Sequence, residues 1–201
     1  MDPLVQQVWG PLIAAYLFLG GMGGASMLFA HYFHTYRKEE GVAAVSAVLS
    51  LVSVVIGVLF LIMDLEKPEL FYLTITSFKV DSWIFKGSVL IMLFIAFGLL
   101  YTAAFFKPFK WLPWAESESG MWLLGWIASI LGLGVATYTG ILLGVAKAVP
   151  FWHSPGLPAL FVASALATGI ALVAVVNIAE GLRVPEEERA RYRDHCTKMA
   201  K

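Results

Sequence analysis

Charged residues and cysteine are both scarce in this chain. Asp, Glu, Lys and Arg make up 14% of the 201 residues, and the formal net charge is zero, which argues against nucleic acid as a partner. The one cysteine, Cys196, lies in the polar C-terminal segment. A single cysteine excludes a disulfide within the chain, an iron–sulfur cluster held by this chain alone and haem attachment through Cys-x-x-Cys-His. Any redox chemistry here therefore uses other groups or a partner subunit.

Histidine is also too sparse to hold a haem between two membrane spans. A membrane anchor of the cytochrome b type usually supplies axial histidines from two facing spans. His31 and His34 share one apolar run, His153 lies between two later runs, and His195 lies in the polar tail. We therefore expect no haem and no metal ion in this chain. We interpret His31 as a hydrogen-bonded histidine near the membrane interface.

Long apolar runs fill most of the remaining sequence, which is 59% hydrophobic. A hydrocarbon core about 30 Å thick needs roughly 20 helical residues to cross it. The start, Met1-Asp2-Pro3, lacks the basic region of a cleaved signal peptide, so we expect the first run to remain as a helix. The sequence predicts an all-α integral membrane protein with a transmembrane domain over residues 1–182 and a short cytoplasmic helical tail over 183–201. The five predicted spans cover residues 12–33, 42–63, 84–106, 120–146 and 157–180.

Lysines and arginines are distributed unevenly between the two sets of loops. Ten of the 14 follow the first, third and fifth spans, and four lie on the opposite side. Because cytoplasmic loops carry an excess of Lys and Arg, this pattern places the N-terminus outside and the C-terminus in the cytoplasm. An odd number of spans agrees with that orientation.

A few polar side chains are predicted at membrane depth. Asp64 directly follows the second span at its outer end, where a carboxylate can simply face water. Tyr138 and Thr139 lie about two turns inside the outer end of the fourth span, and Tyr16 lies at a similar depth in the first. A buried tyrosine hydroxyl needs a hydrogen-bond partner, which is ordinarily the backbone of another helix. The grouping of these residues at one level predicts a shared polar site.

Five segments of the chain are similar, in the same order, to segments of one family of membrane proteins. They are W-G-P-L-I-A-A-Y-L-F-L-G-G-M-G-G-A (9–25), D-L-E-K-P (64–68), T-S-F (76–78), Y-T-G-I-L-L (138–143) and L-P-A-L-F-V-A-S-A-L-A-T-G (157–169). On these segments the chain resembles the NrfD/polysulfide-reductase membrane-subunit family. Each segment is weakly specific, but their common order makes the resemblance specific up to the fifth span.

The resemblance implies a role in an oxidoreductase complex of the inner (cytoplasmic) membrane. Members of the family exchange electrons between menaquinone or ubiquinone and an iron–sulfur, ferredoxin-like partner subunit. That partner usually connects to a catalytic subunit with a molybdenum or tungsten pterin, which converts the terminal substrate. The resemblance implies that the first four spans form a quinone-binding four-helix bundle without haem or iron–sulfur cluster.

The resemblance also assigns residues. Tyr138 matches a tyrosine expected to donate a hydrogen bond to a quinone carbonyl, and Thr139 adjoins it. Asp64 is a candidate for handling the protons that quinol oxidation releases. Tyr16 and His153 are further candidates for quinone binding because of their depth and loop position. We expect the iron–sulfur partner to dock on the two outer loops, over residues 65–82 and 147–157, because the polar residues lie nearest that face.

Two departures from the family pattern and one alternative function remain. Glu66 and Lys67 stand where the family commonly has glycine and arginine, so the bidentate fork of an arginine is missing. Members commonly have about eight spans rather than five. The alternative is a non-redox membrane anchor or small carrier with a structural polar cluster, although we find no inverted repeat of the kind common in transporters.

Overall fold

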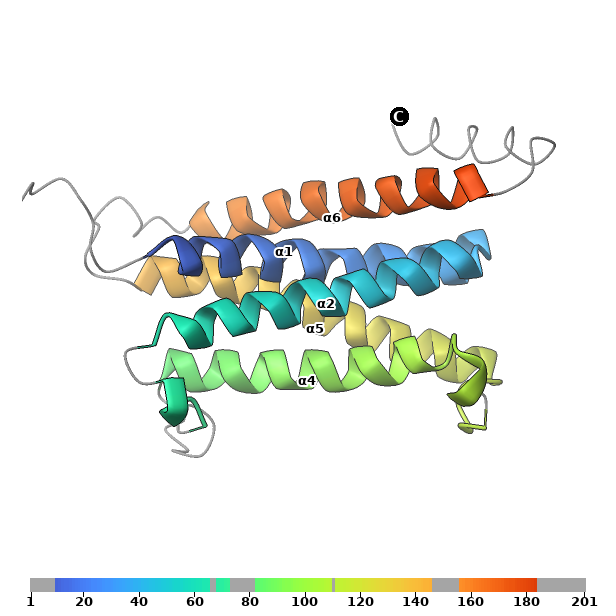
Figure 1. Cartoon of the computed structure of the whole chain (residues 1–201), viewed down its shortest axis with the longest axis horizontal. Helices are drawn as coiled ribbons and strands as arrows, with labels where there is room; N and C mark the ends of the chain where they lie inside the picture. Colours follow the sequence, from blue (N-terminus) through green and yellow to red (C-terminus); the bar gives the residue numbers. More distant parts are fainter. Residues whose placement is uncertain (1–9, 66–67, 73–81, 110, 146–155, 184–201) are drawn as a thin grey trace, which may run out of the picture.

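The structure is a computed structural model of the chain, and it describes residues 10–65, 68–72, 82–109, 111–145 and 156–183 (Figure 1). These residues form helices and turns, with no strand among them. Five helices are long and apolar enough to cross a membrane, which confirms the expected number for this part of the chain. They are α1 (Pro11–Tyr32), α2 (Glu40–Met63), α4 (Trp83–Ala103), α5 (Glu118–Val145) and α6 (Gly156–Arg183).

The first helix continues further than the apolar run predicts. A turn of π-helix, η1 (Phe33–Arg37), extends α1, and Lys38 ends it in the left-handed conformation with φ 57°. Left-handed backbone is uncommon for a residue with a side chain, and at a helix end it stops the helix. Because of this extension, His34 and Thr35 lie on helical backbone. Two short 3₁₀ turns, η2 (Pro68–Leu70) and η3 (Lys107–Phe109), complete the described elements.

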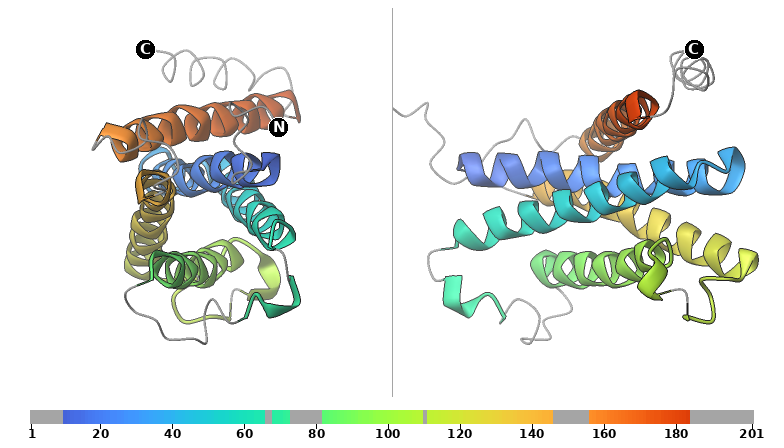
Figure 2. Two further views of the ribbon diagram at one scale, coloured as in Figure 1. Left: turned by 90° about the vertical axis from the view of Figure 1, so that its left-hand side faces the viewer. Right: turned by 45° about the vertical axis from the view of Figure 1, so that its right-hand side comes forward.

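Four of the long helices enclose a common core. α1 packs along α2 and α5, and α4 packs against α5 and α2, so that these four form a ring when viewed end-on (Figure 2). Buried side chains from all four fill its centre, including Met27, Val54, Phe94 and Ala128. α6 lies outside the ring against α1 and α5. The predicted grouping of the first four spans is therefore present, while quinone binding by it stays a prediction.

Close packing of α1 depends on glycines and one hydrogen bond. A Cβ added at Gly24 would overlap the carbonyl of Gly132, so the backbones of α1 and α5 approach each other directly. On its other side α1 contacts α2, where the hydroxyl of Ser50 donates a 2.6 Å hydrogen bond to the carbonyl of Gly23 in α1. Small residues allow such approaches in membranes, where lipid gives helices no hydrophobic drive to associate. α1 is thus the central helix, in contact with α2, α5 and α6.

The bundle has two ends, which we name by one residue each. The Asp64 end contains the start of α1 and α4 and the end of α2; it is on the left in Figure 1. The Lys38 end contains the end of α1 and α4 and the start of α5. Which end faces the cytoplasm stays a prediction. The expected cytoplasmic tail, residues 183–201, lies outside the described residues except for Arg183, which ends α6, and most of the expected outer loops lie outside them as well.

Candidate functional site near the Asp64 end

Tyr138 joins two helices near the Asp64 end. Its hydroxyl donates a 2.9 Å hydrogen bond to the backbone carbonyl of Trp83, in the first turn of α4. The ring lies against Gly87, where an added Cβ would overlap it. Only 8% of Tyr138 is exposed. The third predicted span, which the sequence did not place at this site, therefore supplies both the partner of the hydroxyl and the room for the ring.

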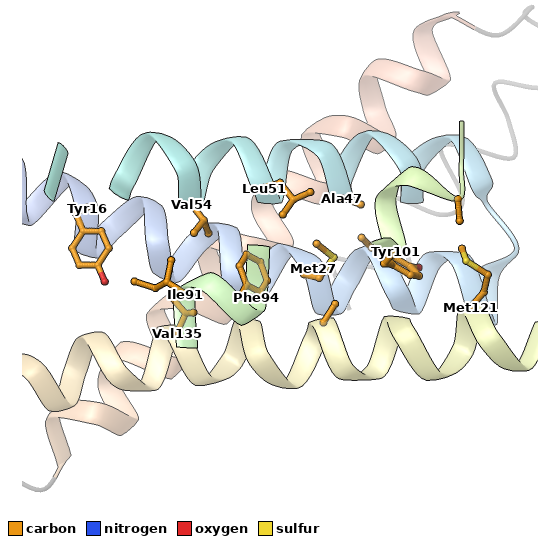
Figure 3. Close-up of a cluster of buried hydrophobic side chains, with 13 residues drawn as sticks. Tyr16, Met27, Ala47, Leu51, Val54, Ile91, Phe94, Tyr101, Met121 and Val135 are labelled. Atoms are coloured by element: carbon orange, nitrogen blue, oxygen red, sulfur yellow. The ribbon is translucent and has the colours of Figure 1, made fainter. Parts of the chain in front are cut away.

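Tyr16 lies inside the ring of helices with its hydroxyl unpaired. The side chain is fully buried, and its hydroxyl has no hydrogen-bond partner among the described residues (Figure 3). A Cβ added at Gly57 of α2 would lie 3.4 Å from the Tyr16 ring, an ordinary contact distance, so the ring packs against α2 at this residue. A buried hydroxyl without a partner is unfavourable and rare in native proteins. This donor is therefore the natural candidate for a bond to a ligand.

Tyr16 and Tyr138 lie at the same end of the bundle, on two helices that pack against each other. A Cβ added at Gly20 of α1 would lie 3.6 Å from the Tyr16 ring and 3.9 Å from Cγ1 of Val135, which comes one turn before Tyr138 in α5. α1 and α5 can hold them at one level because the two helices approach closely at Gly24. One of the two hydroxyl donors is unpaired, and the other could exchange its backbone partner for a ligand. Such a pair can donate to the oxygens of a small carbonyl compound.

Thr139 and His153 contribute less to this arrangement. Thr139 is buried, but its hydroxyl donates to the carbonyl of Ala136 in its own helix at 2.7 Å. Because its proton is engaged, Thr139 could accept a hydrogen bond here but not donate one. His153 lies outside the described residues, so its proposed role stays a prediction.

Asp64 lies at the end of α2 and close to the start of α1. The side chain is exposed, and a Cβ added at Gly10, the N-cap of α1, would lie 3.1 Å from its Oδ1. A carboxylate at a helix N-terminus is favoured by the helix dipole and the unpaired N–H groups there. Because it is exposed, the carboxylate of Asp64 has access to water at the same end of the bundle as the two tyrosines.

Two pockets among the described residues lie away from the two tyrosines. One pocket, of about 540 Å³, is at the Lys38 end and is lined by His34, Thr35 and Lys38 among others. A second, of about 290 Å³, is between α1 and α6 and is lined mainly by apolar side chains. Neither is lined by Tyr16 or Tyr138.

The contacts of His31 agree with the expected hydrogen bond, while its position near the membrane interface stays a prediction. Its Nδ1 is 3.3 Å from the hydroxyl of Thr35, one turn further along, as expected for a hydrogen-bonded histidine. The residue is nevertheless 1% exposed, and its Nε2 has no partner among the described residues. The spacing of His31 and Thr35 was visible in the sequence. The burial was not, because it depends on Gly125 of α5, where an added Cβ would overlap the imidazole. No group of three His, Cys, Asp or Glu side chains able to hold a metal ion occurs within the described part of the chain.

These features define a class: a multi-pass helical membrane protein with a pair of buried tyrosines near one end of its helical bundle. The family follows from comparison with known proteins. A family model described as "Polysulphide reductase, NrfD" matches residues 3–195, so the chain belongs to the NrfD family. This finding confirms the resemblance that the five sequence segments indicated.

Curated relatives include components of reductases from several bacteria. The chain is 29% identical to the C component of polysulfide reductase from Wolinella succinogenes, over 81% of this chain and 56% of that protein. It is 30% identical to the C component of tetrathionate reductase from Salmonella typhimurium, over 89% of this chain and 52% of that protein. It is 24% identical to the NrfD protein of Escherichia coli, over 92% of this chain and 64% of that protein. The chain thus spans about half to under two thirds of these relatives, and no solved structure matches it.

Proposed function

We propose that the chain is the quinone-reactive membrane subunit of a multi-subunit reductase complex. Relatives that match most of the chain are named as components of polysulfide, tetrathionate and selenate reductases. The carrying observation is the unpaired, fully buried hydroxyl of Tyr16, at the same end of the bundle as Tyr138. The proposed substrate is menaquinone or ubiquinone. The proposed partners are an iron–sulfur, ferredoxin-like subunit and a catalytic subunit with a molybdenum or tungsten pterin.

Quinone fits the chemistry of the tyrosine pair. A quinone headgroup is a flat, apolar ring with two carbonyl acceptors, and it needs a donor for each carbonyl within an apolar site. Tyr16 has a hydroxyl ready to donate, and Tyr138 can exchange the Trp83 carbonyl for a quinone oxygen. Burial of both hydroxyls excludes competing water and strengthens the two hydrogen bonds.

In the proposed reaction Asp64 transfers protons between the quinone site and water. When a quinol is oxidised to a quinone, two electrons go to the iron–sulfur partner and two protons leave the quinol oxygens. The exposed carboxylate of Asp64 lies at the same end of the bundle and can pass these protons to water. In the opposite direction the same carboxylate returns protons to the reduced quinone.

The test separates reaction with quinone from the rest of the complex. In the intact complex, Tyr16→Phe should lower the activity that uses quinone or quinol but leave activity with a water-soluble dye unchanged, because the dye bypasses the membrane subunit. Tyr36→Phe is the matched control, since Tyr36 is 60% exposed at the Lys38 end and should change neither activity.

An equal fall of both activities in Tyr16→Phe would show that the residue holds the assembly together. The quinone assignment would then fail. The alternative, a non-redox membrane anchor, would then be favoured, because a purely structural tyrosine would also make the bond between Tyr138 and the Trp83 carbonyl.

A further inference from the structure

Polar and aromatic side chains from α1, η1, α4 and α5 meet inside the bundle at the Lys38 end. His31 lies edge-on to Trp126 with ring centroids 5.3 Å apart, and edge-on to Tyr101 at 6.0 Å. His34 also contacts Tyr101 at 6.0 Å, and Thr35 is 3.3 Å from the Nδ1 of His31. We call these five residues the His31 cluster. Tyr101 is fully buried and His31 almost so.

Four polar atoms of the His31 cluster have no hydrogen-bond partner within the described part of the chain. They are the Nε2 of His31, the Nδ1 of His34, the hydroxyl of Tyr101 and the Nε1 of Trp126. More than nine in ten buried polar groups in native proteins bond to protein or to ordered water, and only a few per 100 residues do not. Four such atoms within one cluster therefore indicate a bound polar ligand.

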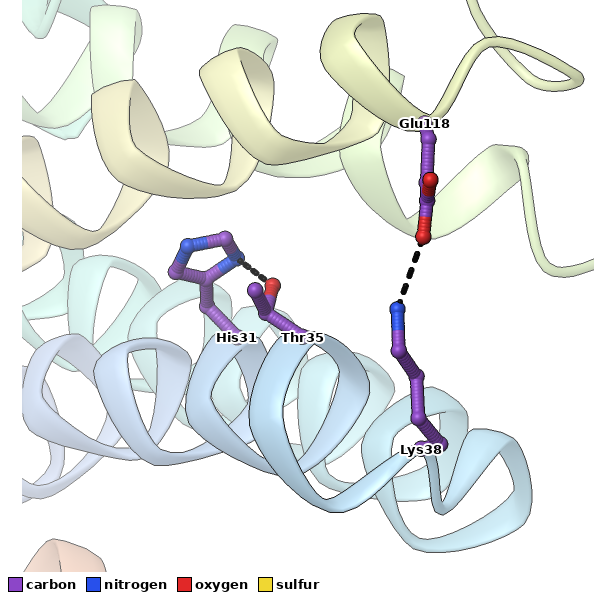
Figure 4. A network of polar contacts seen from close by, with 4 residues as sticks. All are labelled: His31, Thr35, Lys38 and Glu118. Carbon is purple, nitrogen blue, oxygen red and sulfur yellow. Dashed lines mark hydrogen bonds and ion pairs between the residues drawn. The ribbon is translucent and has the colours of Figure 1, made fainter.

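The His31 cluster adjoins the pocket of about 540 Å³ at the Lys38 end. His34 and Thr35 belong to both the cluster and the lining of the pocket. Thr35 is also the residue that contacts His31 in Figure 4. At the outer side of the pocket Lys38 donates a 2.9 Å hydrogen bond to Glu118 of α5. Both of these side chains are largely exposed, so the pocket begins where the protein meets water.

We propose that the His31 cluster is a hydration site, in which ordered water that enters through this pocket binds the four unpaired atoms. Together, the four atoms require a ligand that can both donate and accept hydrogen bonds. An indole N–H can only donate, a neutral imidazole has one donor and one acceptor, and a phenol can do either. Water satisfies such a set because it donates and accepts. A lipid tail can do neither, and the phosphate of a lipid headgroup cannot donate to an imidazole acceptor.

The hydrated site is separate from the tyrosine pair. Fully buried side chains such as Met27, Val54 and Phe94 lie between them (Figure 3). His31 follows Tyr16 by 15 residues on one continuous helix, or about 22 Å at 1.5 Å per residue. Water at the Lys38 end therefore stops short of Tyr16. The inference does not depend on the proposed function in quinone chemistry.

X-ray hydroxyl-radical footprinting of the full-length protein tests the proposal, because radicals form at bound water and modify the side chains beside it. Tyr101, His31 and Trp126 should be modified although the surface of the first two is almost entirely buried. Met27 and Phe94 are the controls, since both are fully buried in the same bundle and both react readily when water is near. We expect them to remain unmodified.

A variant tests the route of entry. Thr35→Val keeps the size of the side chain but replaces the hydroxyl that joins the pocket to His31, so modification of His31 should fall while Met27 stays unmodified. Unchanged modification of His31 in the variant would overturn entry through the pocket. Modification of Tyr101 and His31 no greater than that of Met27 in the natural protein would overturn hydration, whether the site is dry or filled by a co-purified lipid.

Discussion

The two tyrosine hydroxyls of the candidate site differ in what each contributes to stability before any ligand binds. Tyr16→Phe removes a buried hydroxyl that has no partner among the described residues, so the protein should become more stable, by up to about 1–3 kcal/mol. Tyr138→Phe removes the bond to the Trp83 carbonyl, so the free energy of unfolding of this variant should fall by about 0.5–1.5 kcal/mol. Thermal unfolding of the detergent-solubilised variants measures both the expected gain and the expected loss of stability.

The same two variants should rank differently in quinone affinity. Tyr16→Phe loses a bond that forms only with quinone, which weakens affinity by a factor of about 2–12. Tyr138→Phe should lose less, because the natural protein already gives up the bond to Trp83 when quinone binds. Affinities measured by quenching of tryptophan fluorescence would contradict this exchange if Tyr138→Phe proved the more harmful of the two.

Sequence reasoning reached the tyrosines but not their surroundings. Depth along an apolar run predicted that Tyr16 and Tyr138 would lie at one level, and in the structure both lie toward the Asp64 end of two helices that pack against each other. The Trp83 carbonyl and Gly87 could not be predicted, because they depend on which face α4 turns toward α5. Long runs that are apolar on every side carry little information about that choice.

The helices themselves were easier to predict than their contacts. A span must be about 20 residues long, so the length of each apolar run fixes the helix within a few residues. The exception is η1 (Phe33–Arg37), where polar residues resemble the start of a loop although the backbone remains helical. The position of α1 at the centre also could not be predicted, since G-x-x-x-G patterns show that a helix packs closely but not against which neighbour.

The G-x-x-x-G pair of α1 provides a test at this scale, because only one of its glycines is sterically required. A Cβ at Gly24 would overlap the Gly132 carbonyl, whereas a Cβ at Gly20 would lie 3.6 Å from the Tyr16 ring, an ordinary contact. Gly24→Ala should therefore push α1 and α5 apart and destabilise the bundle by about 1–3 kcal/mol. Gly20→Ala should be neutral to slightly stabilising, because alanine favours the helix.

Unfolding of the two alanine variants under identical detergent conditions decides the matter. An equal loss in both would mean that the motif acts as a unit along a broader interface. The direct approach of α1 and α5 at Gly24 would then not be the specific constraint that holds Tyr16 at the level of Tyr138.

For the molecule as a whole, the two ends of the bundle differ in chemistry. The Asp64 end has the tyrosine pair and an exposed carboxylate, while the Lys38 end has the His31 cluster and the ion pair between Lys38 and Glu118. Electron transfer falls steeply with distance, so an iron–sulfur partner should dock at the end that holds the proposed quinone site. Buried apolar side chains fill the bundle between the two ends, so a partner docked at the Lys38 end would be separated from the proposed quinone site.

A photo-crosslinking amino acid at one exposed tyrosine of each end tests the docking side. Tyr72, 48% exposed beside η2 at the Asp64 end, should crosslink to the iron–sulfur partner in the assembled complex. Tyr36, 60% exposed in η1 at the Lys38 end, should not. Both positions replace one aromatic side chain by another on the surface, so assembly should be unaffected. Crosslinks from Tyr36 alone would place the partner beside the His31 cluster, and the quinone site would then have to lie there rather than at Tyr16 and Tyr138.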